Sequence, residues 1–89
     1  MVYETIFDDT FRDHIKKFTL AERKLIFSKI ELLKNNLDHN SLRTQKLRKT
    51  HENRYESSVS MDIRLIWQLD GDTIFIEDVG RHDILKKYG

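Results

Sequence analysis

Apolar and polar residues alternate with two different periods along this chain. Residues 2–7 alternate as a short strand with one buried face does. From Asp8 or Asp9, either of which can cap a helix, the period changes to that of a helix. The apolar positions that follow are spaced by four and then three residues: Phe11, Ile15 and Phe18. The pattern predicts a strand followed by a short helix.

A second helix is predicted to begin at Thr19. The sequence TLAE has the form of a capping box, in which the Thr19 hydroxyl and the Glu22 carboxylate satisfy free backbone donors at the helix start. The helix that follows carries an apolar stripe formed by Ile26, Ile30, Leu33 and Leu37. We expect it to end around Asn35–Asn36, before a polar connector at 38–41. The two helices form an αα-hairpin.

The second half of the chain has a period of two. In MDIRLIWQL, residues 61–69, one face carries Met61, Ile63, Leu65, Trp67 and Leu69, and the other carries Asp62, Arg64, Ile66 and Gln68. Asp70-Gly71 indicates a tight turn, and TIFIEDV supplies the partner strand of a hairpin. If the loop consists of these two residues, Arg64 faces Glu77 and the two form a cross-strand ion pair. Residues 54–59, RYESSV, indicate one further strand.

The order β-α-α-β-β-β predicts an α+β fold. We expect a small, antiparallel, twisted sheet with the N-terminal αα-hairpin packed on one face and the other face open. The pairing of the first strand is left undetermined by the pattern. With 89 residues, the chain supports one core, so residues 1–89 are predicted to form a single domain.

Composition narrows the classes of function. The chain has no cysteine, which excludes a disulfide framework or a thiolate metal site. Its four histidines lack metal-binding spacing, and no cofactor fingerprint is present, so no metal and no cofactor are predicted. No signal peptide or membrane-spanning run is apparent, which makes the cytoplasm the expected location. The net charge of +1 is too small to indicate nucleic-acid binding by itself.

The distribution of the charges is more informative than their sum. Residues 43–54, RTQKLRKTHENR, carry five Lys or Arg and one His against a single Glu. Such a stretch attracts phosphate, and Arg64 on the polar side of the next strand adds a guanidinium. The end of the chain, VGRHDILKKYG, adds Arg81, His82 and Tyr88, which respectively bind phosphate, titrate near neutral pH and stack on a base. Each signal alone has an ordinary structural explanation, since most surface charges are merely solvated.

Together these segments resemble a known family. KLRKTHENRYESSVSMDIRLIWQLDGDTIFIEDVGRHDILKKY is similar to the carboxy-terminal half of the RelE/ParE superfamily of bacterial toxins. The most specific parts are KLR before the sheet, DIRLI in the strand, and VGRHD followed by a late aromatic. Within the superfamily the chain looks closest to the RelE and YafQ ribonuclease branches. The resemblance implies a messenger-RNA interferase and the RelE fold.

The resemblance also implies roles for individual residues. Arg64 contacts the scissile phosphate, His82 is the catalytic histidine, Tyr88 is the aromatic that assists proton transfer or stacks on a base, and Arg81 adds positive charge. RNA is expected to contact Lys46, Arg48, Lys49, His51, Arg54, Lys86 and Lys87. The chain departs from RelE at Glu56, Ser57 and Ser58, where RelE has lysines.

The expected reaction needs no metal: the ribose 2′-hydroxyl attacks the adjacent phosphorus and leaves a 2′,3′-cyclic phosphate. The expected partners are messenger RNA, the ribosome and a cognate antitoxin protein, with no membrane and with DNA reached only through the antitoxin. The superfamily also contains ParE-type inhibitors of DNA gyrase. A non-enzymatic inhibitor or an inactive protein-binding module is therefore the alternative.

Overall fold

The computed structural model describes residues 2–47 and 53–88. The strands are β1 (Glu4–Phe7), β2 (Gln45–Lys46), β3 (Arg54–Ser58), β4 (Ile63–Asp70) and β5 (Thr73–Arg81). The α-helices are α1 (Asp9–Ile15), α2 (Leu20–Asn35) and α3 (Leu85–Tyr88), and the 3₁₀ helices are η1 (Asn40–Leu42) and η2 (His82–Ile84). Among these described helices, none combines the length and the apolar character needed to cross a membrane.

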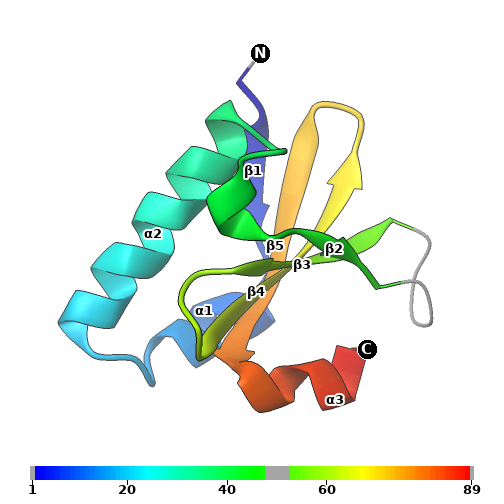
Figure 1. The fold of residues 1–89 in the computed structure, drawn as a ribbon. Coiled ribbons are helices and arrows are strands. Elements are labelled where there is room, and N and C mark those ends of the chain that lie inside the picture. Colours follow the sequence, from blue (N-terminus) through cyan, green and yellow to red (C-terminus); the bar gives the residue numbers. More distant parts are fainter. Residues whose placement is uncertain (1, 48–52, 89) are drawn as a thin grey trace.

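The strands form one five-stranded sheet in the order β1-β5-β4-β3-β2 (Figure 1). Three of the four pairings are antiparallel, whereas β1 runs parallel to β5. The α+β class is therefore confirmed, but the sheet is mixed and not purely antiparallel. The first strand lies at an edge of the sheet, and periodicity within a strand carries no information about the direction of its neighbour.

Helix α2 begins and ends where the sequence predicts. The Thr19 hydroxyl accepts a hydrogen bond from the Glu22 backbone N–H (3.2 Å), and the Glu22 carboxylate accepts one from the Thr19 N–H (2.9 Å). The main core lies between one face of the sheet and the first two α-helices, α1 and α2. Its largest members include Phe11, Ile26, Leu33, Leu65 and Ile76. The predicted helical hairpin on one face is thus confirmed.

The β4–β5 hairpin has a different register from the predicted one. Asp70 pairs with Thr73, so the loop is Gly71-Asp72, and Gly71 has a positive φ of 56°. Glycine at the first loop position matches a type II′ turn. A register shift after Ile66 moves the pairing further. As a result Arg64 faces Gly80, and the predicted Arg64–Glu77 ion pair was wrong.

The same hairpin starts later than predicted. Met61 lies before β4 and is 93% exposed, so its assignment to the buried face was wrong. Ser60 explains this boundary, because its hydroxyl accepts a hydrogen bond from the Ile63 N–H (3.1 Å) and closes the turn between β3 and β4. The buried row therefore begins at Ile63.

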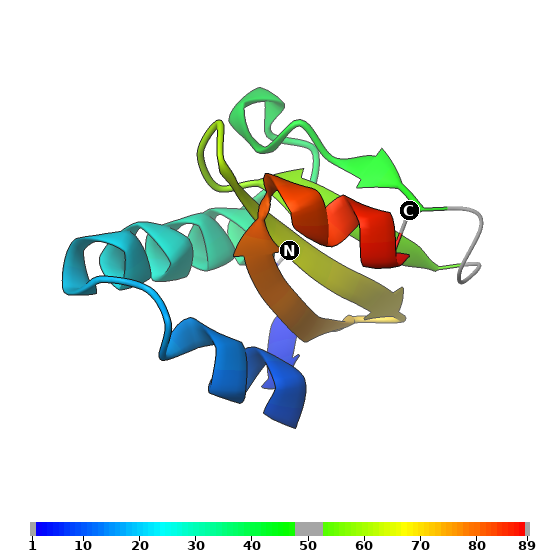
Figure 2. The same cartoon turned by 90° about the horizontal axis from the view of Figure 1, so that it is seen from below.

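The second face of the sheet is only partly open, contrary to the expectation. Helix α3 lies across this face, apart from α2 (Figure 2). Tyr88 at its end is 8% exposed, and Ile66 on β4 is fully buried, although neither belongs to the main core. The residues after β5 therefore fold back over the sheet. With only four residues, α3 is too short for its sequence pattern to predict a helix.

Candidate active site

Arg64 lies on the second face of the sheet, opposite the main core. One nitrogen of its guanidinium is held by the protein backbone. Its Nη1 donates to the backbone oxygens of Ser60 (2.6 Å) and Ile63 (3.3 Å). Among the described residues it forms no ion pair. Nε and Nη2 remain as two parallel donors, which is the geometry that binds two phosphate oxygens at once. The turn thus fixes the side chain, and no described carboxylate lies within ion-pairing distance of its guanidinium.

Glu56 on the neighbouring strand shares this face. It pairs with Ile66, two residues from Arg64 on β4, so Glu56 and Arg64 are diagonal neighbours. The Glu56 side chain is 6% exposed. Burial raises the pKa of its carboxyl, while the positive charges of Arg64 and His82 act in the opposite direction. A carboxyl group with a raised pKa near two cationic groups is suited to taking and releasing a proton.

His82 completes this group of three residues. It is the first residue of η2 and is exposed to solvent. Gly80, two residues before His82, pairs with Arg64 across β4 and β5, and the charge of His82 acts to lower the pKa of Glu56. The structure therefore brings together Arg64 and His82, as the sequence predicted, and adds Glu56, which the sequence analysis noted only as a departure from RelE.

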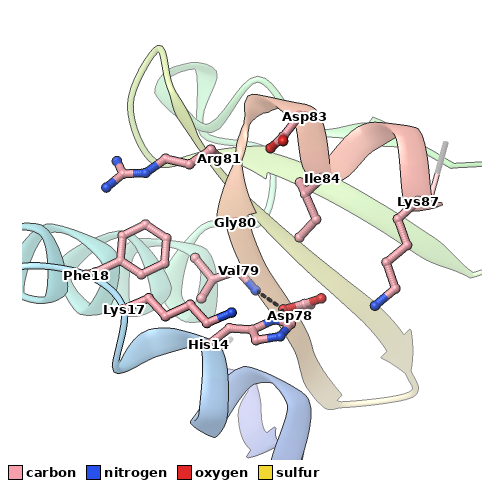
Figure 3. A pocket seen from close by; sticks show the side chains of 10 residues that line it. All are labelled: His14, Lys17, Phe18, Asp78, Val79, Gly80, Arg81, Asp83, Ile84 and Lys87. Carbon is pink, nitrogen blue, oxygen red and sulfur yellow. Dashed lines mark hydrogen bonds and ion pairs between the residues drawn. The ribbon is translucent and has the colours of Figure 1, made fainter.

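Arg81 does not join this group. Its side chain lies on the face of α2, where Nη1 contacts Glu22 (2.7 Å) and Asp62 (3.1 Å). Figure 3 shows it extending from β5 away from Asp78. The hydrogen bond from Arg81, followed by the one from the Thr19 N–H, lowers the pKa of Glu22 to about 2. Arg81 thus forms ion pairs with two carboxylates. Its guanidinium is engaged within the protein, whereas the sequence had suggested that it binds phosphate.

Tyr88 is likewise held by a carboxylate. Its hydroxyl donates to Asp78 Oδ2 (2.7 Å). Asp78 Oδ1 lies 2.6 Å from His14 Nδ1 and accepts the Val79 N–H at 2.8 Å; Figure 3 draws these three residues. Asp78 is 1% exposed, so one buried side chain joins α1, β5 and α3. Burial, followed by the hydrogen bond to Asp78, raises the pKa of Tyr88. The hydroxyl is therefore held in its neutral form.

The predicted RNA-binding residues fall into three groups. Lys46, Lys86 and Lys87 are exposed and available to a ligand. Arg54 instead forms a bidentate pair with Glu77, at 3.0 Å and 2.8 Å, and its guanidinium lies 5.2 Å from the centre of the Tyr88 ring. The remaining three lie outside the described residues: Arg48, Lys49 and His51.

Solved structures provide a comparison for this arrangement. No family model and no curated protein sequence matches the chain. In structure, the chain is similar to YafQ from Escherichia coli, with a TM-score of 0.74, 19% identity, and coverage of 93% of this chain and 97% of that one. It is also similar to a chain of the RelB–RelE antitoxin–toxin complex of Methanococcus jannaschii, with a TM-score of 0.73, 26% identity, and coverage of 93% and 96%. A chain of the RelBE2 toxin–antitoxin complex of Mycobacterium tuberculosis gives a TM-score of 0.77 at 19% identity, covering 92% and 100%.

This chain has the fold of RelE-like toxins. In the RelE-like fold as this sequence builds it, Gly80 has a packing role. A Cβ added there would meet Ile84 at 2.8 Å from Cδ1 and 3.0 Å from Cβ. The absence of a side chain at Gly80 therefore lets η2 approach β5 and sets the position of His82. Gly80 lies within β5, one residue before its end.

We expect Gly80→Ala to destabilise this RelE-like chain by about 1–3 kcal/mol, because an added methyl forces η2 away from the strand. Thermal denaturation measures the effect. The cost should be smaller in an Ile84→Ala background, where the closest of the opposing atoms is gone. An equal cost in both backgrounds would show that the close approach of η2 is unimportant.

Proposed function

We propose that the chain is the toxin of a type II toxin–antitoxin system and that it is a cytoplasmic endoribonuclease that cleaves messenger RNA on the ribosome. The observation that supports this most directly is the grouping of Glu56, Arg64 and His82 on one face of the sheet. It combines a buried carboxyl with a raised pKa, a guanidinium that forms no ion pair with the described residues, and an exposed imidazole. The similarity to YafQ and RelE chains supports the same assignment.

In the proposed reaction, Glu56 removes the proton of the ribose 2′-hydroxyl. The oxygen attacks the adjacent phosphorus, and the bond from phosphorus to the 5′-oxygen breaks. Protonated His82 donates its proton to that leaving oxygen, which yields a 2′,3′-cyclic phosphate and a free 5′-hydroxyl. Arg64 stabilises the negative charge that develops on the phosphoryl oxygens. RNA is required because DNA lacks the attacking hydroxyl.

Tyr88 has a different role in this proposal from the one the resemblance implies. Its hydroxyl already donates to Asp78, and its raised pKa makes it a weak proton donor at neutral pH. We assign it to holding α3 on the sheet. Arg81 and Arg54 are assigned to ion pairs with Glu22 and Glu77, respectively, and not to phosphate binding.

The function is tested by incubating the purified chain with messenger RNA, with and without translating ribosomes. We expect cleavage that resists EDTA and leaves 2′,3′-cyclic phosphate ends. Inhibition of gyrase supercoiling without RNA cleavage would support the ParE-type alternative instead. Cleavage that requires a divalent cation would contradict the proposed chemistry.

We also propose an antitoxin partner that covers this face with an acidic or amphipathic segment. The matched structures of RelB–RelE and RelBE2 are described as toxin–antitoxin complexes. Cells that produce the folded chain alone are expected to stop growing, whereas co-production of the antitoxin restores growth. Normal growth with abundant folded chain would contradict the proposal.

Lys46 provides a quantitative test of RNA binding. It is exposed on β2, which pairs with β3 beside the proposed site. Lys46→Ala should reduce the slope of log affinity against log salt concentration by about 1, because one phosphate contact is lost. Lys24→Ala on α2 is the control, since Lys24 is equally exposed but belongs to the helix on the other face. Equal slopes for the parent and Lys46→Ala would remove Lys46 from the interface.

A further inference from the structure

A cavity adjoins Arg64, and its lining contains two arginines and three serines beside Val59 and Met61. Its volume is about 350 Å³, and the residues around it include Ser41, Arg43, Ser58, Ser60 and Arg64. Its described lining contains two cations and no carboxylate. By contrast, Arg54 and Arg81 elsewhere are each paired with acidic residues. The cavity is thus positively charged and rich in hydroxyl groups, which is the chemistry of an anion site.

Arg43 has an unusual backbone. Its φ of 45° and ψ of 46° lie in the left-handed region, where it caps the C-terminal end of η1. Glycine or asparagine normally occupies such a position, because a larger side chain is strained there. Arg43 is the sole non-glycine residue with positive φ among the residues that the structure describes. Strain of this kind, when found at a possible ligand site, points to a functional constraint.

The residues on both sides of Arg43 hold it in this conformation. Leu42 is fully buried in the core. The Thr44 hydroxyl lies 2.7 Å from the Ser57 hydroxyl, which also accepts a hydrogen bond from the indole N–H of Trp67 at 2.9 Å. The chain therefore cannot relax by shifting either neighbour. The Arg43 side chain itself is exposed and forms no ion pair with any described residue.

The serines supply directed hydrogen-bond donors. Ser60 Oγ accepts the Ile63 N–H at 3.1 Å, so its own hydrogen is left to donate to a ligand. Its backbone oxygen accepts from Arg64 Nη1 at 2.6 Å, which ties this donor to the guanidinium that faces the cavity. Two guanidinium groups and a positioned hydroxyl match a phosphodiester, which offers several acceptor oxygens and one negative charge.

We propose that this cavity, through Arg43, binds the phosphate of the RNA nucleotide next to the cleaved bond, while Arg64 holds the cleaved phosphate. The proposal rests on the ribonuclease function given above and extends it with a second phosphate subsite. The two phosphate contacts together then align the RNA strand across β4. Arg43 acts on binding and alignment, and the proton transfers remain with Glu56 and His82.

The central variant is Arg43→Gly, which removes the side chain and relieves the backbone strain. We expect the midpoint of thermal unfolding to rise by about 3–6 °C. Affinity for a short RNA that carries a 2′-deoxy sugar at the cleavage position, and so cannot be cut, should fall by about 10- to 100-fold, the usual effect of losing a charge-assisted contact. A variant that is more stable and yet binds more weakly cannot be explained by misfolding.

A neutral methylphosphonate at the neighbouring position identifies the phosphate concerned. It should weaken binding of the parent chain to a similar degree but leave Arg43→Gly unaffected, because the contact is already absent. Arg12→Ala, which removes an exposed charge from α1, is the control for general electrostatics. The subsite is refuted if Arg43→Gly binds as the parent does, or if the methylphosphonate weakens both chains equally.

A titration with inorganic pyrophosphate separates the subsite from the ribonuclease function. Amide shifts at Ser58 and Ser60 should respond in the parent and not in Arg43→Gly. If the parent cleaves RNA and Arg43→Gly has the same KM, the subsite is wrong and the function stands. If no RNA is cleaved but pyrophosphate binding depends on Arg43, the function is wrong and the cavity is still a phosphate site.

Discussion

Glu56→Gln is expected to lower the rate of RNA cleavage by about 10²–10⁴, the usual contribution of a positioned proton-transfer group. Glutamine keeps the size and hydrogen-bonding capacity of the side chain but cannot accept the 2′-hydroxyl proton. Single-turnover cleavage at saturating RNA measures the effect. Glu4→Gln on β1 is the matched control, since Glu4 is exposed and lies at the far edge of the sheet.

The same substitution has an opposite effect on stability. The pKa of Glu56 is raised in the folded chain, so its contribution to stability is fully present below the unfolded pKa and is lost as pH rises through the folded pKa. At neutral pH the ionised carboxylate therefore opposes folding. Glu56→Gln should be at least as stable as the parent at pH 7, and this advantage should vanish near pH 4. Chemical denaturation at the two pH values checks the sign.

His82→Gln should reduce cleavage by a similar factor for the complementary reason. A carboxylate base and an imidazolium acid give a bell-shaped dependence of kcat/KM on pH. Glu56→Gln should remove the acidic limb, and His82→Gln should remove the alkaline limb. Because His82 is exposed, its replacement should change stability by no more than about 0.5 kcal/mol. Near-parental cleavage by either variant would contradict the assigned roles.

Asp78→Ala is expected to be the most destabilising of these changes, at about 3–5 kcal/mol. The substitution leaves the Tyr88 hydroxyl, the His14 imidazole and the Val79 N–H without their shared acceptor, and it opens a space where Asp78 was 1% exposed. A small domain has a total stability of about 5–15 kcal/mol, so the loss is a large part of it. Equilibrium denaturation in urea measures it.

Tyr88→Phe is the matched, milder change. It removes the hydrogen bond to Asp78 and keeps the buried ring, so we expect a loss of about 0.5–1.5 kcal/mol. The two variants together also test the role of Tyr88. If Tyr88→Phe retains its stability but loses cleavage by a factor of 100 or more, Tyr88 transfers a proton, and its assignment to holding α3 is wrong.

The sequence was sufficient for the elements whose local signals are strong. The capping box at Thr19 and Glu22 is a purely local arrangement, and it is present as predicted. The alternation from Ile63 to Leu69 likewise identified the inner face of β4, since Ile63, Leu65 and Trp67 belong to the main core and Leu69 packs against it. Such features depend on neighbours a few residues away, which is the range that a periodic pattern describes.

Features that depend on distant partners were not predicted. Arg64 pairs with Gly80 and not with Glu77, because the turn places Gly71 at a loop position with positive φ and the register shifts again after Ile66. Glu56 became part of the candidate site through its strand pairing with Ile66, and Asp78 gained partners from α1 and α3. The local sequence pattern predicts none of these contacts, because the residues involved are far apart along the chain.

The parallel pairing of β1 with β5 has a consequence for folding of the chain during its synthesis. The first strand can find its partner only after Thr73–Arg81 has been synthesised, and His82 follows directly after that strand. Protein synthesis proceeds from the amino end, and contacts between distant segments form late in folding. A nascent chain still within the ribosome therefore has an incomplete sheet and no assembled candidate site. Under the proposed ribonuclease function, we expect a nascent chain to be unable to cleave RNA until β5 and His82 have left the ribosome.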